Sequence, residues 1–273
     1  MTSSKRGLTT ALSGDGELVS VTREALGGSE IAVVRMQRAP VNSLNLALIE
    51  ELTGVIRELD RDPSLQGMVL ASNQRAFSAG LDLTEVYKAS ESHFRKFWGS
   101  FEELWYTLYM SRLATAAAVE TNSPAAGSVL ALSCDYRVVA DDPKLRMGLN
   151  ETQVGMVCPR WLQQLCARTV GERTSELLLQ RGYMMSAEEA LKFGFVDEMV
   201  PRDEVMGRAL HFLEPMVKLP PNARATTKKQ QREAIAAMCG PHSGTELWDV
   251  INTEECQTTI ENIMTALRNK KKK

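Results

Sequence analysis

The chain has 273 residues, of which 44% are hydrophobic and 24% are charged, and its formal net charge is −2. This composition is typical of a globular protein with a substantial core, and the slight acidic excess argues against nucleic-acid binding, which usually needs a basic surface. The five cysteines include no C-x-x-C pair, which argues against a disulfide framework or a zinc site and favours a reducing compartment. No apolar run reaches the ~18 residues that a membrane span needs.

The two ends of the chain are polar. The first thirteen residues, MTSSKRGLTTALS, contain Lys5 and Arg6 but no acid, as mitochondrial transit segments do. An untethered N-terminus has a similar composition, so both interpretations stay open. We expect the basic run from Lys270 to Lys273 to be a solvated tail.

The first half of the chain predicts strands followed by helices. Two short apolar or alternating runs flank Gly27-Gly28, as the strands of a hairpin do. Apolar residues at helical spacing, with Pro63 soon after the last of them, indicate a helix. The predicted elements are hairpin strands at 19–23 and 31–36, a helix at 48–59, a buried strand at 68–71 and an amphipathic helix from about 82 to 109.

The same alternation continues to residue 200. Ser186 and Glu189 form a capping box that opens a helix, and Gly194 is typical of its end. The other predicted elements are strands at 116–119, 136–140 and 195–200 and a brief helix that ends at 134. Beyond Arg202 no strand pattern remains. The fold class is therefore α/β, with ββα-like units in residues 1–200 and a helical region in residues 201–273.

Several kinds of catalytic chemistry lack their sequence signatures. The chain contains no Gly-Lys dipeptide and no G-x-G-x-x-G, which argues against nucleotide-phosphate loops. Its three histidines have no H-E-x-x-H spacing, and Ser78 stands in F-S-A-G rather than in G-x-S-x-G. We therefore expect neither a metal nor a Ser-His-Asp triad, and His93 is interpreted as a helix-surface residue.

Two turns of small residues each follow a buried strand and precede a predicted helix. They are AFSAGLDL at 76–83 and SPAAGSVLAL at 123–132. Backbone N–H groups at a helix start have no intrahelical partner, and Gly80 and Gly127 would let a ligand oxygen approach them. Either turn alone could be an ordinary connection. If the two lie side by side, one N–H group from each could bind the same oxygen as an oxyanion hole.

With their surroundings, these turns resemble the crotonase (enoyl-CoA hydratase/isomerase) superfamily. The resemblance covers nearly the whole chain from Val19 and rests on the order and spacing of PVNSL at 40–44, the two turns with CDYRVVAD up to 141, GLNETQVGM at 148–156 and SAEEALKFGFVDEMV at 186–200. FSAGLDL and GLNE are most similar to the mitochondrial Δ3,Δ2-enoyl-CoA isomerase branch. The resemblance implies a spiral of ββα repeats, C-terminal helices that pack in a homotrimer, and an acyl-CoA thioester as substrate, so that no separate cofactor is needed.

The resemblance also implies roles for individual residues. The oxyanion donors would be the backbone N–H groups of Leu81 and Ala126, and Glu151 would be the catalytic carboxylate. The residues expected to line the CoA or acyl sites are Ala79, Gly80, Asp82, His93, Phe94, Phe97 and Asn150.

One position separates the possible reactions. Moving a double bond from C3 to C2 requires one carboxylate, which takes a proton from C2 and returns one to C4. Hydratases of the superfamily carry a second glutamate where this chain has Val129, which cannot activate water. We therefore expect a Δ3,Δ2-enoyl-CoA isomerase of unsaturated fatty acid β-oxidation in the mitochondrial matrix, with the peroxisome and the cytosol as other locations. An enoyl-CoA hydratase and a non-catalytic acyl-CoA-binding protein are the alternatives.

The chain departs from the family pattern at two places. Ala126 replaces the usual glycine, and it would be strained if the turn needs a positive φ angle there. Glu120-Thr121 replaces the usual Asn-Gly, and we expect Glu120 to be salt-bridged or exposed. Lys228 and Lys229 are expected to be solvated, although contact with a CoA phosphate is an alternative.

Overall fold

The computed structural model describes residues 18–239 and 243–270. The polar segment 1–13 and Lys271 to Lys273 lie outside these ranges. No helix in the described ranges is both long and apolar enough to cross a membrane.

A six-stranded sheet with the order β1-β2-β3-β4-β6-β8 forms the centre of the molecule. The antiparallel hairpin of β1 and β2 is confirmed, and the remaining neighbours pair in parallel. The strands are β1 Val19–Leu26, β2 Ser29–Met36, β3 Leu65–Ser72, β4 Ala114–Val119, β6 Tyr136–Ala140 and β8 Glu198–Val200. The last of these is shorter than the predicted strand at 195–200. A second, two-stranded sheet pairs β5 Ser123–Pro124 with β7 Met147–Gly148 in parallel.

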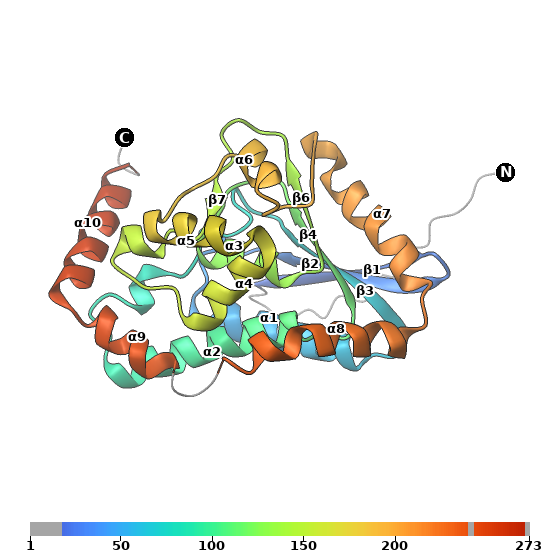
Figure 1. Cartoon of the computed structure of the whole chain (residues 1–273), viewed down its shortest axis with the longest axis horizontal. Coiled ribbons are helices and arrows are strands. Elements are labelled where there is room, and N and C mark those ends of the chain that lie inside the picture. Colours follow the sequence, from blue (N-terminus) through green and yellow to red (C-terminus); the bar gives the residue numbers. More distant parts are fainter. Residues whose placement is uncertain (1–17, 240–242, 271–273) are drawn as a thin grey trace.

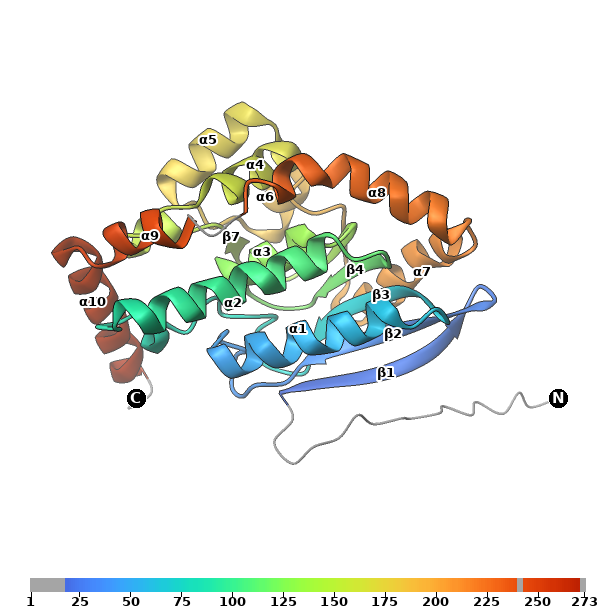
Figure 2. The same ribbon diagram turned by 90° about the horizontal axis from the view of Figure 1, so that it is seen from below.

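Helices cover both faces of the larger sheet, which confirms the α/β class. Figures 1 and 2 place α1, Leu46–Arg61, on one face and α7, Val205–Val217, on the other. The apolar positions predicted for α1 face inward, and Leu48, Ile49, Leu52 and Ile56 are fully buried. The parallel strands therefore have apolar side chains on both faces, which explains their continuous apolar sequences.

The amphipathic helix begins later than predicted. Asp82 caps only a short 3₁₀ turn, η1 Leu83–Glu85. The α-helix α2 runs from Glu91 to Tyr109, after Ser90, whose hydroxyl accepts a hydrogen bond from the His93 N–H group at 3.3 Å. The helical spacing of apolar residues continues across this break, so the spacing hides the second cap from a prediction based on periodicity.

Shorter helices connect the remaining strands. They are α3 Ala126–Ser133, the 3₁₀ turn η2 Glu151–Val154, α4 Arg160–Val170, α5 Glu172–Arg181 and α6 Ala187–Lys192. The capping box of Ser186 and Glu189 is present at the start of α6, as predicted. α4 and α5 had no counterpart in the sequence prediction.

The described residues beyond 201 form helices and no strand, as predicted. After η3 Arg202–Glu204 and α7, they form α8 Pro221–Ala236, α9 Ser243–Ile251 and α10 Glu254–Lys270. Figure 1 shows α9 and α10 at the end of the molecule opposite β1. There the ring centroids of Trp248 in α9 and Phe94 in α2 lie 5.6 Å apart. The Cys256 thiol of α10 donates a hydrogen bond to the Val154 carbonyl of η2.

Candidate active site

Asn42 organises the first small-residue turn. Its side chain is fully buried, and its amide nitrogen donates to the Phe77 carbonyl at 3.1 Å and to the Ser72 hydroxyl at 2.8 Å. In return, the Ser78 hydroxyl donates to the Asn42 carbonyl at 2.7 Å. The PVNSL segment therefore fixes the backbone of AFSAGLDL from across the fold. This role of Asn42 has no signal in the sequence, where PVNSL is recognisable only as part of the family pattern.

The backbone N–H group of Leu81 points out of the turn. The Leu44 N–H group donates to the Gly80 carbonyl at 2.8 Å, and the Asp82 N–H group donates to the Leu44 carbonyl at 3.0 Å. In such a parallel bridge, the residue between the two bonded positions faces away from the partner. Within the described residues, the Leu81 N–H group donates no hydrogen bond.

The second turn places Ala126 at the first position of α3. Ala125 has φ 47° and ψ −121°, and its N–H group donates to the Gly148 carbonyl at 2.8 Å. The strained residue is therefore Ala125, and the positive φ considered for Ala126 was placed one residue too late. In the part of the chain that the structure describes, the Ala126 N–H group also donates no hydrogen bond.

The two turns are packed against each other. A Cβ atom at Gly127 would lie 2.7 Å from the Ser78 carbonyl oxygen, and one at Gly80 would lie 3.5 Å from the Ala126 nitrogen. Glycine is therefore required for this close approach, and it brings the residues next to Leu81 and Ala126 into contact. Only the second turn leads directly into an α-helix, because η1 follows the first. The helix dipole consequently contributes at Ala126 and not at Leu81.

Glu151 follows the strand that borders the second turn. Pairing of β5 with β7 joins Pro124 to Gly148, and Glu151 opens η2 three residues later. Burial raises the pKa of the Glu151 carboxyl above its usual 4.5, against smaller lowering effects from its own backbone amide and from the Cys158 thiol. The Cys158 thiol donates a hydrogen bond to Oε2 of Glu151 at 3.3 Å. This carboxyl group therefore lies in surroundings that favour holding a proton.

Val129 is buried one turn into α3, with 1% of its surface exposed. The helix around it is apolar or small at every position, AGSVLALS. Glu120, the other carboxylate of this region, was expected to be salt-bridged or exposed. It is half-buried and forms no ion pair among the described residues.

The remaining predicted site residues make contacts within the protein. Asp82 forms an ion pair with Arg38 at 2.9 Å, and Nε2 of His93 lies 2.6 Å from a Glu85 carboxylate oxygen. Phe94 and Phe97 are fully buried, so the aromatic side of α2 belongs to the core. Ala79 is exposed and Asn150 is half-buried. Contact of these residues with a CoA ester stays a prediction.

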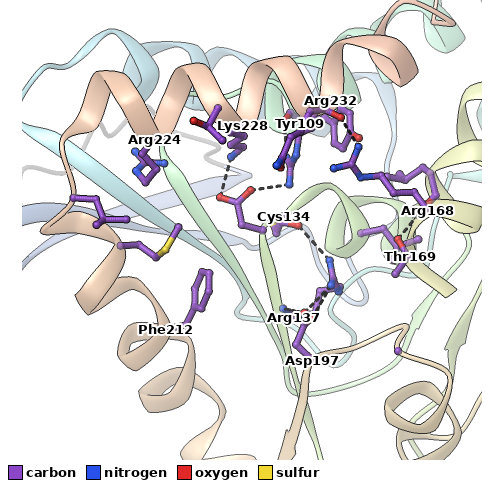
Figure 3. A pocket seen from close by; sticks show the side chains of 18 of the residues that line it. Tyr109, Cys134, Arg137, Arg168, Thr169, Asp197, Phe212, Arg224, Lys228 and Arg232 are labelled. Atoms are coloured by element: carbon purple, nitrogen blue, oxygen red, sulfur yellow. Dashed lines mark hydrogen bonds and ion pairs between the residues drawn. The ribbon is translucent and has the colours of Figure 1, made fainter. Parts of the chain in front are cut away.

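A cavity of about 730 Å³ lies elsewhere, between α8 and the core (Figure 3). Its most buried charges form ion pairs, in which Asp135 binds Lys228 at 3.0 Å and Arg232 at 2.7 Å. Lys228 is thus buried, so the expectation of a solvated lysine was wrong, whereas Lys229 is exposed as predicted. Neither Glu151 nor the two unpartnered amides line this cavity. We interpret its charged cluster as the attachment of α8 to the end of β6.

The described residues contain no group of three or more His, Cys, Asp or Glu side chains that could hold a metal ion.

Comparisons with known proteins agree on one family. The profile of the family described as Enoyl-CoA hydratase/isomerase matches residues 27–246. Enoyl-CoA delta isomerase 1, mitochondrial, of Mus musculus is 41% identical over 214 residues, which cover 78% of this chain and 74% of the mouse protein. The Homo sapiens protein of the same name is 40% identical over 211 residues, which cover 77% of this chain and 70% of that protein.

A solved structure has the same fold over nearly its whole length. The crystal structure of human mitochondrial delta3-delta2-enoyl-CoA isomerase superimposes with a TM-score of 0.88 and 36% identity, covering 92% of this chain and 99% of that one. The spiral fold with C-terminal helices is therefore confirmed. The chain belongs to the enoyl-CoA hydratase/isomerase family.

Proposed function

We propose that the protein is a Δ3,Δ2-enoyl-CoA isomerase (dodecenoyl-CoA isomerase), which converts 3-enoyl-CoA to trans-2-enoyl-CoA. The observation that carries this proposal is one half-buried carboxyl group, Glu151, whose pKa is raised by burial. It lies near two turns in contact that each present a backbone N–H group without a hydrogen-bond partner among the described residues. The similarity to mouse and human isomerases supports the same assignment.

In this proposal the thioester carbonyl oxygen accepts hydrogen bonds from the N–H groups of Leu81 and Ala126. These bonds stabilise the negative charge that develops on the oxygen when C2 loses a proton. The Glu151 carboxylate takes that proton, and the electrons of the C2–H bond spread over C1 to C4 and the oxygen as a dienolate. The Glu151 carboxylic acid then donates a proton to C4, which leaves the double bond between C2 and C3.

The environment of Glu151 suits a group that must both take and return a proton. Because burial raises its pKa, the two protonation states are closer in free energy at neutral pH than for an exposed glutamate. Val129 stands where hydratases have a second carboxylate, so no side chain there can activate water for addition to the double bond. An apolar side chain at this position supports isomerisation over hydration.

The finer assignments belong to the same proposal. Residues 79–82, Asn150 and the segment of His93 to Phe97 would contact the CoA ester. The protein would act in the mitochondrial matrix, in β-oxidation of unsaturated fatty acids, as a homotrimer assembled through its C-terminal helices. The names of the mouse and human relatives support the location. Light scattering of the purified chain would measure the assembly.

The decisive experiment incubates the purified chain separately with cis- and trans-3-enoyl-CoA and with trans-2-enoyl-CoA of several lengths. Isomerisation yields a chromatographically distinct product of unchanged mass from the 3-enoyl esters. Fast gain of one water by the 2-enoyl ester would identify a hydratase instead. Binding of both esters by calorimetry without conversion of either would identify a non-catalytic acyl-CoA-binding protein.

A further inference from the structure

Cys158 returns to the Glu151 carboxylate after a tight loop. Gly155 ends η2 with φ +74°, and the Met156 N–H group donates to the Glu151 carbonyl at 2.9 Å. Pro159 then stands at the N-cap of α4. This path turns the chain back within seven residues, so that the thiol of Cys158 lies 3.3 Å from Oε2 of Glu151.

Among the described residues, the Cys158 thiol is the side-chain hydrogen-bond partner of this carboxylate, and its own backbone amide is the other polar group that lowers its pKa. Within the described residues, no side chain other than Cys158 donates a hydrogen bond to Glu151, and no cation forms an ion pair with it. The charged side chains described on the helices packed against η2 form no ion pair or hydrogen bond with it; they are Glu172, Arg173, Glu176 and Arg181 on α5 and Glu254, Glu255, Glu261 and Arg268 on α10. Cys166 of α4 is the remaining titratable group near it.

We propose that Cys158 is a positioning residue that holds Oε2 of Glu151 and so leaves Oε1 as the oxygen that carries the substrate proton. This inference rests on the proposed isomerase activity. A carboxylate with one bound oxygen has fewer orientations than one that rotates freely, and proton transfer depends strongly on the distance between the reacting atoms.

The chemistry of the thiol fits this role. Burial, and next the nearby Glu151 charge, raises the pKa of Cys158 well above its usual 9, so the thiol stays protonated and able to donate at neutral pH. A thiol is a weak donor, and it therefore lowers the pKa of the glutamate only in part. Glu151 keeps a raised pKa while its orientation is restricted. A strong cationic partner would instead hold the carboxylate ionised and hinder the return of the proton to C4.

The test compares C158A, C158S and the matched control C166A, whose thiol interacts with Ser175 instead. Isomerisation of 3-enoyl-CoA is followed across pH. For C158A we expect kcat to fall about 3- to 10-fold with KM nearly unchanged. We also expect the acidic limb of the pH profile to move to higher pH, because the ionised Glu151 carboxylate loses a hydrogen-bond donor. C158S keeps a hydrogen-bond donor, so its kcat and the position of its acidic limb should lie close to those of the parent protein. C166A should match the parent protein.

An unchanged C158A profile would overturn the proposal. Equal losses in C158A and C158S without movement of the acidic limb would also overturn it, because they would indicate packing alone. A direct readout is the titration of Glu151 in protein with ¹³C-labelled glutamate carboxyl groups, in which the Glu151 signal is identified by its loss in E151Q. We expect a higher Glu151 pKa in C158A than in the parent. This titration still tests the contact if the parent protein does not convert 3-enoyl-CoA, an outcome that would refute only the proposed function.

Discussion

Replacement of Glu151 by glutamine should stop isomerisation while leaving the folded protein intact. General acid–base catalysis typically contributes 10²- to 10⁴-fold, and here one group would act twice, at C2 and at C4. We therefore expect kcat to fall by ~10⁴-fold, which corresponds to about 5 kcal/mol of transition-state stabilisation. Glutamine has the same shape, and its carbonyl oxygen can accept the Cys158 hydrogen bond, so affinity for the CoA ester should change little.

Stability should separate loss of chemistry from loss of folding. The folded-state pKa of Glu151 is raised, so its contribution to stability is fully present below the unfolded pKa of about 4.5 and is lost as pH rises through the folded pKa. At neutral pH, a neutral glutamine should thus make the protein at least as stable as the parent in urea unfolding.

Chromatography of the 3- and 2-enoyl esters measures the rate, and calorimetry measures ester binding. The matched control is E120Q, which changes a half-buried carboxylate outside the proposed site and should retain activity. Retention by E151Q of more than a tenth of the parent kcat would refute the single-carboxylate mechanism.

Three further outcomes follow from the same contacts. In the proposed mechanism Glu151 has to be ionised to accept the first proton, so the acidic limb of kcat/KM should lie above pH 4.5. A limb at or below that value would contradict the effect of burial. G127A places a Cβ atom 2.7 Å from the Ser78 carbonyl oxygen, so it should lower the free energy of unfolding in urea by about 1–3 kcal/mol. It should also lower kcat, because the two turns are pushed apart. A fully active variant would show that their close packing is not needed. D135N removes the negative charge that Lys228 and Arg232 share, and it should cost about 3–5 kcal/mol in urea unfolding. A loss below 1 kcal/mol would show that this cluster does not attach α8.

Local sequence signals predicted the elements well where each signal acts on its own segment. The hairpin around Gly27-Gly28, the apolar spacing of α1 and the capping box at Ser186 all appear in the structure. The two glycine turns were likewise recognisable, because glycine at Gly80 and Gly127 reflects space that the backbone itself occupies. The α2 start was wrong because the apolar spacing continues through the caps at Asp82 and Ser90.

Contacts between distant segments could not be read from one sequence. Asn42 lies 35 residues before the Phe77 carbonyl that it binds, and no periodicity links the two. In the sequence, Lys228 and its neighbour Lys229 both indicate solvated side chains. The ion pair of Lys228 with Asp135, 93 residues away, appears only when α8 packs beside that residue. Cys158 has no signature at all, since its contact with Glu151 depends on the left-handed turn at Gly155. Such residues become visible only after the chain is folded.

The strain in the second turn gives a final prediction, because it lies at Ala125 and not at Ala126. A non-glycine residue with φ 47° and ψ −121° costs about 1–3 kcal/mol, whereas glycine adopts this conformation readily. The greater freedom of glycine in the unfolded chain offsets about 0.4–1 kcal/mol of the relief. A125G should therefore leave the free energy of unfolding unchanged or raise it by up to ~2.6 kcal/mol.

A126G is the matched control at the first position of α3, where no positive φ is relieved and glycine should destabilise by about 0.5–1 kcal/mol. Both variants keep the Ala126 N–H group, so both should remain active isomerases if the oxyanion proposal is right. Urea unfolding of A125G and A126G shows which variant has the larger free energy of unfolding. A more stable A126G than A125G would place the strain at Ala126 and refute the turn geometry on which the proposed oxyanion role of its N–H group depends.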